Sequence, residues 1–169
     1  DMSKTRYSLW SDQCREKLFN FVSGNGHEAD IINLLKGGLD KQNKYPWQSV
    51  NYLESHDDYT LIDRLCSPEE WNNGSPPEDA INRAKLAIGL LLLCPGIPML
   101  ASGQDYLRCK NGVRNTYKRP DLNALDYDKL SILEYIHVWT KDFIRFRMSE
   151  LGSLVRAKKF LSSDQYEII

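Results

Sequence analysis

Two short apolar segments, each followed at once by polar residues and separated by a helical pattern, constrain the fold of this chain most. Residues 48–53 run into the letters ESHDD, and residues 97–101 run into SGQD. Short strands that alternate with helices favour a parallel sheet with crossover helices. In such sheets, ligands bind at the loops that follow the carboxyl ends of the strands. The sequence therefore predicts an α/β fold, with the polar clusters at residues 56–58 and 103–121 on one rim.

Helical periodicity surrounds these strands. Apolar residues at i, i+4, i+7 and i+8 predict a helix over Asp12–Val22, with Ser11 as its N-cap. The run Ser75-Pro76-Pro77-Glu78 fits a capping box and predicts a second helix, which ends at Pro95-Gly96. The other expected elements are a short helix at 30–36, a long loop at 106–127, a helix at 129–149 and a strand at 166–169.

Charge and cysteine usage exclude several classes of partner. The net charge is −1, from 22 Lys and Arg against 23 Asp and Glu, so neither nucleic acid nor an anionic membrane is an expected partner. The longest apolar stretch, residues 90–94, is too short to span a bilayer. The four cysteines form no zinc-type spacing, and no metal site is predicted. Free thiols favour a reducing compartment, but two disulfides stay open, as does the choice between a cytoplasmic and a secreted protein.

The His56-Asp57 pair at the end of the first strand is the candidate site. A hydrolytic triad needs a nucleophile, and no G-x-S-x-G run occurs. A metal site needs more ligands than this pair. An imidazole and a carboxylate suit adjacent sugar hydroxyls, and an ionised carboxylate stabilises positive charge on a sugar ring. On these residues alone, sugar binding and a simply solvated strand end have equal weight.

Two longer motifs favour the sugar. Residues 50–61, VNYLESHDDYTL, resemble the segment at the end of the seventh barrel strand in the alpha-amylase superfamily, and residues 96–105, GIPMLASGQD, resemble its eighth strand. The runs LRCKNG at 107–112 and NTY at 115–117, with the early run YSLWSD at 7–12, are similar to type I pullulanases. Those enzymes cleave alpha-1,6 branch linkages in alpha-glucans such as pullulan, starch and glycogen, and the resemblance covers nearly the whole chain.

This resemblance implies only part of a catalytic domain. A complete (β/α)₈ barrel typically takes about 250 residues, whereas this chain has 169. We therefore expect a partial TIM (β/α)₈ barrel, roughly strands 6–8 with their helices, over residues 1–155. The start of a C-terminal β domain is expected over residues 156–169. The implied partners are an alpha-glucan substrate and a missing N-terminal half of the barrel.

The resemblance also assigns roles to residues. Asp57 matches the carboxylate that stabilises the transition state, and His56 matches the imidazole that binds the same sugar. Asn115, Tyr117 and Asp121 match loop residues that line neighbouring sugar sites. Retaining glycosidases also need a nucleophile and an acid/base carboxylate about 5 Å apart. In the family these end the fourth and fifth strands, so the chain alone is expected to be inactive.

Some positions depart from the family pattern. Asp105 stands where Glu is usual, Cys109 where Thr is common, and Tyr127 where Trp is usual. Gln104 and Arg108 are expected to hold the loop after the second strand in shape. The resemblance allows calcium in the parent enzyme, although the sequence shows no complete calcium site. Two alternatives stay open: a non-catalytic alpha-glucan-binding module, and part of a glucan branching enzyme or transferase of the same superfamily.

Overall fold

The computed structural model describes residues 4–37 and 45–160, and within them a parallel three-stranded sheet organises the chain. Strands β1 (Leu9–Ser11), β2 (Ser49–Tyr52) and β3 (Ile97–Met99) lie in the order β1-β2-β3. Trp10 pairs with Val50, and Asn51 pairs with Pro98. The predicted α/β fold is confirmed. The expected strand at 166–169, and most of the expected domain at 156–169, lie outside the described residues.

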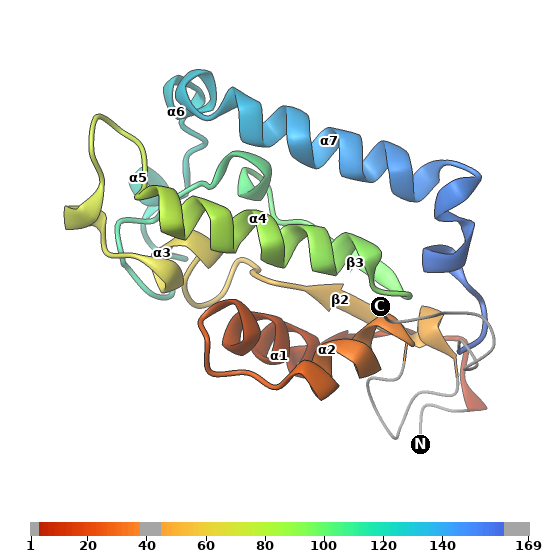
Figure 1. Ribbon diagram of the computed structural model, residues 1–169. Helices are drawn as coiled ribbons and strands as arrows, with labels where there is room; N and C mark the ends of the chain where they lie inside the picture. The colour runs from red at the N-terminus through yellow and green to blue at the C-terminus, as the bar shows by residue number, and fades with distance from the viewer. Residues whose placement is uncertain (1–3, 38–44, 161–169) are drawn as a thin grey trace.

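The helices pack beside this sheet (Figure 1). Helix α1 packs against β2 and against α4, and α4 packs against α7, so the three long helices lie side by side. Among the described residues, no helix is long and apolar enough to cross a membrane. The helices are α1 (Asp12–Val22), α2 (Glu28–Leu35), α3 (Leu61–Leu65), α4 (Glu78–Leu93), α5 (Pro120–Asn123), α6 (Tyr127–Ile132) and α7 (Glu134–Met148), with 3-10 turns at Pro46–Gln48, Pro68–Glu70, Gln104–Tyr106 and Leu151–Arg156.

Helix α4 lies at the centre of the core. The side chains of Ala84, Ala87, Ile88 and Leu91 are fully buried, and Leu92 nearly so, and together they form one apolar stripe along this helix. Cys94, which directly follows the apolar end of this helix, is also fully buried, and all four cysteines are free. The core therefore forms where α4 packs against α1, α3 and α7.

Helix α1 begins and ends as predicted. The hydroxyl of Ser11 accepts a hydrogen bond from the backbone N–H of Cys14 at 3.2 Å, which satisfies one of the free donors of the first turn. Gly24 follows the helix with a φ of 79°, a conformation that favours glycine. The serine just before the helix is also the last residue of β1, so strand and helix join without a loop.

The predicted start of α4 is wrong by two residues. Pro77, not Ser75, is the N-cap, and the helix begins at Glu78 without a side-chain cap. Ser75 instead pairs with Asn72 in an isolated antiparallel bridge. The two prolines explain the shift, because a residue before proline is disfavoured in the helical region. This restriction applies to Ser75 and again to Pro76.

The single helix expected at 129–149 is two helices. The chain bends at Leu133, whose side chain is fully buried, and Asp126 caps the shorter helix α6 by accepting hydrogen bonds from two backbone N–H groups. The apolar side chains of α6 and α7 are only partly buried. Ile136 is buried, and Trp139 and Phe143 pack against the core, whereas three of these side chains are exposed: Ile132, Tyr135 and Phe146.

Candidate functional site

His56 and Asp57 follow the last residue of β2, Tyr52, by four and five positions, at the carboxyl end of the sheet. Their side chains are 76% and 66% exposed, and His56 Nε2 lies 3.5 Å from Asp57 Oδ2. The backbone N–H of Asp57 donates to the hydroxyl of Ser55 at 3.2 Å. The pair is therefore presented to solvent by a buried strand, and it is not part of the core.

His56 faces a cavity of about 450 Å³, which we call the aromatic cavity. The ring of Trp10, from β1, meets the imidazole of His56 edge-on at a centroid distance of 6.1 Å. Tyr117, from the loop after β3, lines the same cavity, and both aromatic side chains are exposed. Ser102, which follows β3, also lines this cavity. The two polar clusters predicted from the sequence thus share one rim.

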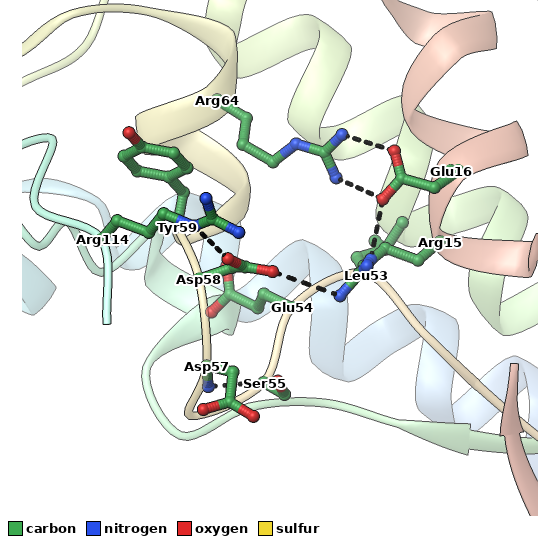
Figure 2. Close-up of a pocket in the computed structure, with 10 residues that line it drawn as sticks. All are labelled: Arg15, Glu16, Leu53, Glu54, Ser55, Asp57, Asp58, Tyr59, Arg64 and Arg114. Atoms are coloured by element: carbon green, nitrogen blue, oxygen red, sulfur yellow. Dashed lines mark hydrogen bonds and ion pairs between the residues drawn. The ribbon is translucent and has the colours of Figure 1, made fainter. Parts of the chain in front are cut away.

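Asp57 lies on a second cavity of about 380 Å³, the arginine cavity (Figure 2). Arg64 donates to Glu16 at 2.8 and 3.2 Å, and Arg114 donates to Asp58. Arg15 lies between Glu16 and Asp58 and contacts both carboxylates. Figure 2 shows the Asp57 carboxylate pointing away from this network. Because its neighbours already pair with one another, Asp57 stays available at the rim.

Glu54 forms the boundary between the two cavities, since it lines both. The residue is only 3% exposed, and its Oε2 accepts a hydrogen bond from the backbone N–H of Leu61. Burial raises the pKa of its carboxyl to about 7. Glu54 Oε1 and Arg108 Nε have no hydrogen-bond partner among the described residues. Two buried polar atoms are therefore free beside the aromatic cavity.

The other predicted site residues divide between the rim and its periphery. Asn115 accepts a hydrogen bond from the backbone N–H of Asp58 at 2.9 Å, so it touches the residue after the His56-Asp57 pair. Asp121, on α5, forms an ion pair with Arg119 at 2.6 Å and lines neither the aromatic nor the arginine cavity. The structure thus groups Asn115 and Tyr117 with the pair, and leaves Asp121 outside.

The loop after β3 is held in shape from within. Gln104 Oε1 accepts from the backbone N–H of Ala101 at 3.0 Å, and Arg108 donates to the carbonyl of Asn123 at 3.2 Å. Asn123 in turn donates to the carbonyl of Thr116 at 2.7 Å. Gln104 and Arg108 therefore make the contacts within the loop that we expected of them.

Three residues of this region could not be predicted as site residues from the sequence. Trp10 lies in a strand of three residues, too short to show alternation. Glu54 begins a run of polar residues after an apolar strand, and because Glu is rarely buried, its burial could not be predicted. Lys110 gave no signal, because lysine is rarely buried, yet its side chain is 1% exposed. Within the described ranges, no group of three or more His, Cys, Asp or Glu could hold a metal ion.

Comparisons with known proteins agree with the motifs. No protein-family model matches the chain. A pullulanase of Bacillus subtilis (strain 168) is 40% identical over 120 residues, which cover 67% of this chain and 16% of that protein. A glycogen debranching enzyme of Dickeya chrysanthemi is 26% identical over 193 aligned residues, which cover 96% of this chain and 29% of that protein.

Solved structures show the same relationship. The pullulanase of Paenibacillus barengoltzii, as a mutant complexed with maltotetraose, superposes with a TM-score of 0.76 at 28% identity. The match covers 90% of this chain and 25% of that chain. This chain thus spans between 16% and 29% of the length of these three relatives. The chain belongs to the family of these pullulanases and glycogen debranching enzymes, and it matches one segment of them.

Proposed function

We propose that this chain is the C-terminal portion of a (β/α)₈ catalytic barrel, with β1, β2 and β3 as strands 6, 7 and 8. The parallel order of the three strands and the layer of helices beside them support this assignment. Among the described residues, β1 and β3 pair only with β2, so each has an outer edge for another strand. A missing N-terminal half of the barrel occupies both edges, and residues 156–169 begin a C-terminal β domain.

The parent enzyme hydrolyses alpha-1,6 branch linkages of alpha-glucans with retention of configuration. The observation that carries this proposal is the exposed His56-Asp57 pair at the carboxyl end of β2, beside a cavity lined by aromatic rings. Ligands of barrel enzymes bind at this end of the strands. The similarity to pullulanases and to a glycogen debranching enzyme supports the choice of linkage.

Asp57 stabilises the positive charge that develops on the sugar ring in the transition state. His56 donates a hydrogen bond to a hydroxyl of the same sugar. Trp10 and Tyr117 offer ring faces to neighbouring glucose units, and Asn115 and Asp121 contact sugars further along the chain. The nucleophile and the acid/base carboxylate come from the other half of the barrel, so hydrolysis needs both halves.

A hybrid enzyme tests this function. The segment of the Bacillus subtilis pullulanase that matches this chain over 120 residues is replaced by the corresponding residues of this chain. We expect the hybrid to release reducing ends from pullulan, with products of retained anomeric configuration in a proton NMR time course. A folded hybrid without pullulan cleavage would contradict the proposal, and transfer products without hydrolysis would favour the transferase alternative.

Calorimetric titration of the chain alone with maltotetraose tests the binding-module alternative. The proposal expects at most weak heat, because half of the groove is missing. Tight binding by the chain alone would instead favour a glucan-binding module.

A further inference from the structure

Asp58, the residue that follows the His56-Asp57 pair, has an unusual backbone conformation. Its φ is 57°, in the left-handed region that residues other than glycine seldom adopt, although Asp and Asn tolerate it best. Such a conformation persists only where surrounding contacts hold it. The contacts around Asp58 therefore show what sets the direction of the chain at Asp57.

Both backbone groups of Asp58 are bound by side chains of the loop after β3. Lys110 Nζ donates to the carbonyl oxygen of Asp58 at 2.6 Å. Asn115 Oδ1 accepts from the N–H of Asp58 at 2.9 Å. That N–H belongs to the peptide group that joins Asp57 to Asp58, so its orientation also sets the backbone of Asp57. Arg114, from the same loop, binds the carboxylate of Asp58.

Lys110, which makes the contact with the Asp58 carbonyl, is a buried residue. Its side chain is 1% exposed, and burial, followed by the charge of Arg108, lowers its pKa. Taking a lysine out of water costs free energy unless its ammonium group has partners. Apart from the Asp58 carbonyl, the nearby charges that favour the ammonium form are the carboxylates of Asp63, Glu54 and Asp57.

Asp63, on α3, anchors the loop that carries Lys110. Its carboxylate accepts from the backbone N–H of Lys110 at 2.8 Å, from that of Gly112 at 2.9 Å, and from the thiol of Cys109 at 2.9 Å. Thr60 adds a fourth donor at 2.7 Å. The backbone of Lys110 is thus fixed to Asp63, and its ammonium group binds Asp58, so both ends of Lys110 contact the segment 58–63.

We propose that Lys110 and Asn115 are positioning residues, which hold Asp58 at both of its backbone groups and so fix the direction of the Asp57 carboxylate. The role of Asp57 that this serves rests on the proposed function. The ammonium group of Lys110 acts from below the rim, and its substitution therefore changes the orientation of Asp57 without removing a group that touches the sugar. A misplacement of about 1 Å in a catalytic group can lower a rate about 10²-fold.

The test compares Lys110→Met with Lys141→Met in the hybrid enzyme. Both variants remove one ammonium group, but Lys141 lies exposed on α7. We expect kcat on pullulan to fall by about 10²-fold in Lys110→Met while KM changes much less, because binding of the remaining glucan is kept. Equal kcat values for the two variants would overturn the proposal.

A second pair of variants decides the question if Lys110→Met does not fold by circular dichroism. Asn at position 58 tolerates a positive φ, whereas β-branched Val does not. We expect Asp58→Val to have a kcat at least about tenfold below that of Asp58→Asn, since only the former displaces the backbone. The same kcat in both variants would show that the conformation of Asp58 does not govern Asp57.

Nuclear magnetic resonance of the 169-residue chain separates this inference from the proposed function. We expect the amide proton of Asp58 to exchange faster in Lys110→Met than in Lys141→Met, because the carbonyl on its other side is released. Unchanged exchange would contradict the inference. A hybrid with native Lys110 that fails to cleave pullulan would overturn the proposed function alone, and the exchange comparison would still test the contact.

Discussion

The carboxylate of Glu54 accepts a hydrogen bond from the backbone N–H of Leu61, the first residue of α3. The residue that follows β2 by two positions thereby holds the start of the next helix. The segment between them carries His56, Asp57 and Asp58, so this one contact closes the loop of the candidate site at its base. The contact takes place in the core, where Glu54 is 3% exposed.

Glu54→Gln is predicted to change how stability depends on pH. Burial raises the pKa of this carboxyl from 4.5 to about 7, against the opposing effects of the Leu61 N–H, Arg108 and Lys110, and with a smaller raising effect of Asp63. Between these two pKa values the native state binds more protons than the unfolded state, so stability falls as pH rises. Glutamine does not titrate in this range. The variant should therefore lose this pH dependence of the unfolding free energy, which amounts to on the order of 3 kcal/mol between the two pKa values.

Urea unfolding from pH 4 to pH 8 measures this difference. Glu150→Gln, at an exposed position, is the matched control and should keep the slope of the parent chain. Parallel pH profiles for the parent and Glu54→Gln would contradict the burial of an ionisable Glu54.

Ile88→Ala should destabilise the chain far more than Leu86→Ala, although the two residues lie only two positions apart on α4. Ile88 is fully buried and Leu86 is 48% exposed. Removing a buried side chain loses transfer free energy and leaves a cavity, at a cost of roughly 2–5 kcal/mol. An exposed position costs within about 0.5 kcal/mol. Chemical denaturation measures the unfolding free energy of both variants. Similar losses in the two variants would contradict the observed orientation of α4.

Ser11→Ala should cost about 1 kcal/mol, because the N–H of Cys14 loses its acceptor at the start of α1. Ser153→Ala, at an exposed position near the end of the described chain, is the control. Thermal unfolding followed by circular dichroism compares the two. A midpoint for Ser11→Ala equal to that of the control would show that the cap does not form.

Arg147→Met is predicted to loosen the junction between α4 and β3. The buried guanidinium donates to the carbonyls of Leu92, Cys94 and Gly96 at 2.5, 2.9 and 2.8 Å, and so satisfies the end of α4. Hydrogen bonds from a charged group contribute more than neutral ones, and their loss should cost about 3 kcal/mol.

Arg145→Met provides the comparison, since Arg145 is exposed and forms an ion pair with Asp142 on the same helix. Faster exchange of the amide protons in 92–97 should appear in Arg147→Met alone. Identical exchange in both variants would rule out this role.

Elements with strong periodicity could be predicted from the sequence. The spacing of apolar residues gave helix α1, and Ser11 gave its first residue. The helical pattern of α4 was equally clear, but its start was not, because Pro76 and Pro77 prevent the helix from reaching back to Ser75. The break at Leu133 could not be seen, since a buried leucine fits the period of either one helix or two.

The candidate site was predicted only where residues were adjacent in sequence. His56 and Asp57 follow a strand closely, so their position at the end of β2 came from local pattern. Asp58 accepts a hydrogen bond from Lys110 and donates one to Asn115, and because both partners lie more than fifty positions away in the sequence, no spacing rule predicts these contacts. Asp121 pairs locally with Arg119 and lines neither cavity, so its contact with a more distant sugar stays a prediction.

The most direct test of the central claim is the activity of Asp57→Asn in the hybrid enzyme on pullulan. The substitution keeps the size of the side chain and removes its charge, and we expect a loss of kcat on the order of 10³-fold with the fold unchanged. Asp142→Asn, on the exposed face of α7, should keep the activity of the hybrid. A hybrid that cleaves pullulan equally well with Asn at position 57 would show that the Asp57 carboxylate does not stabilise the transition state.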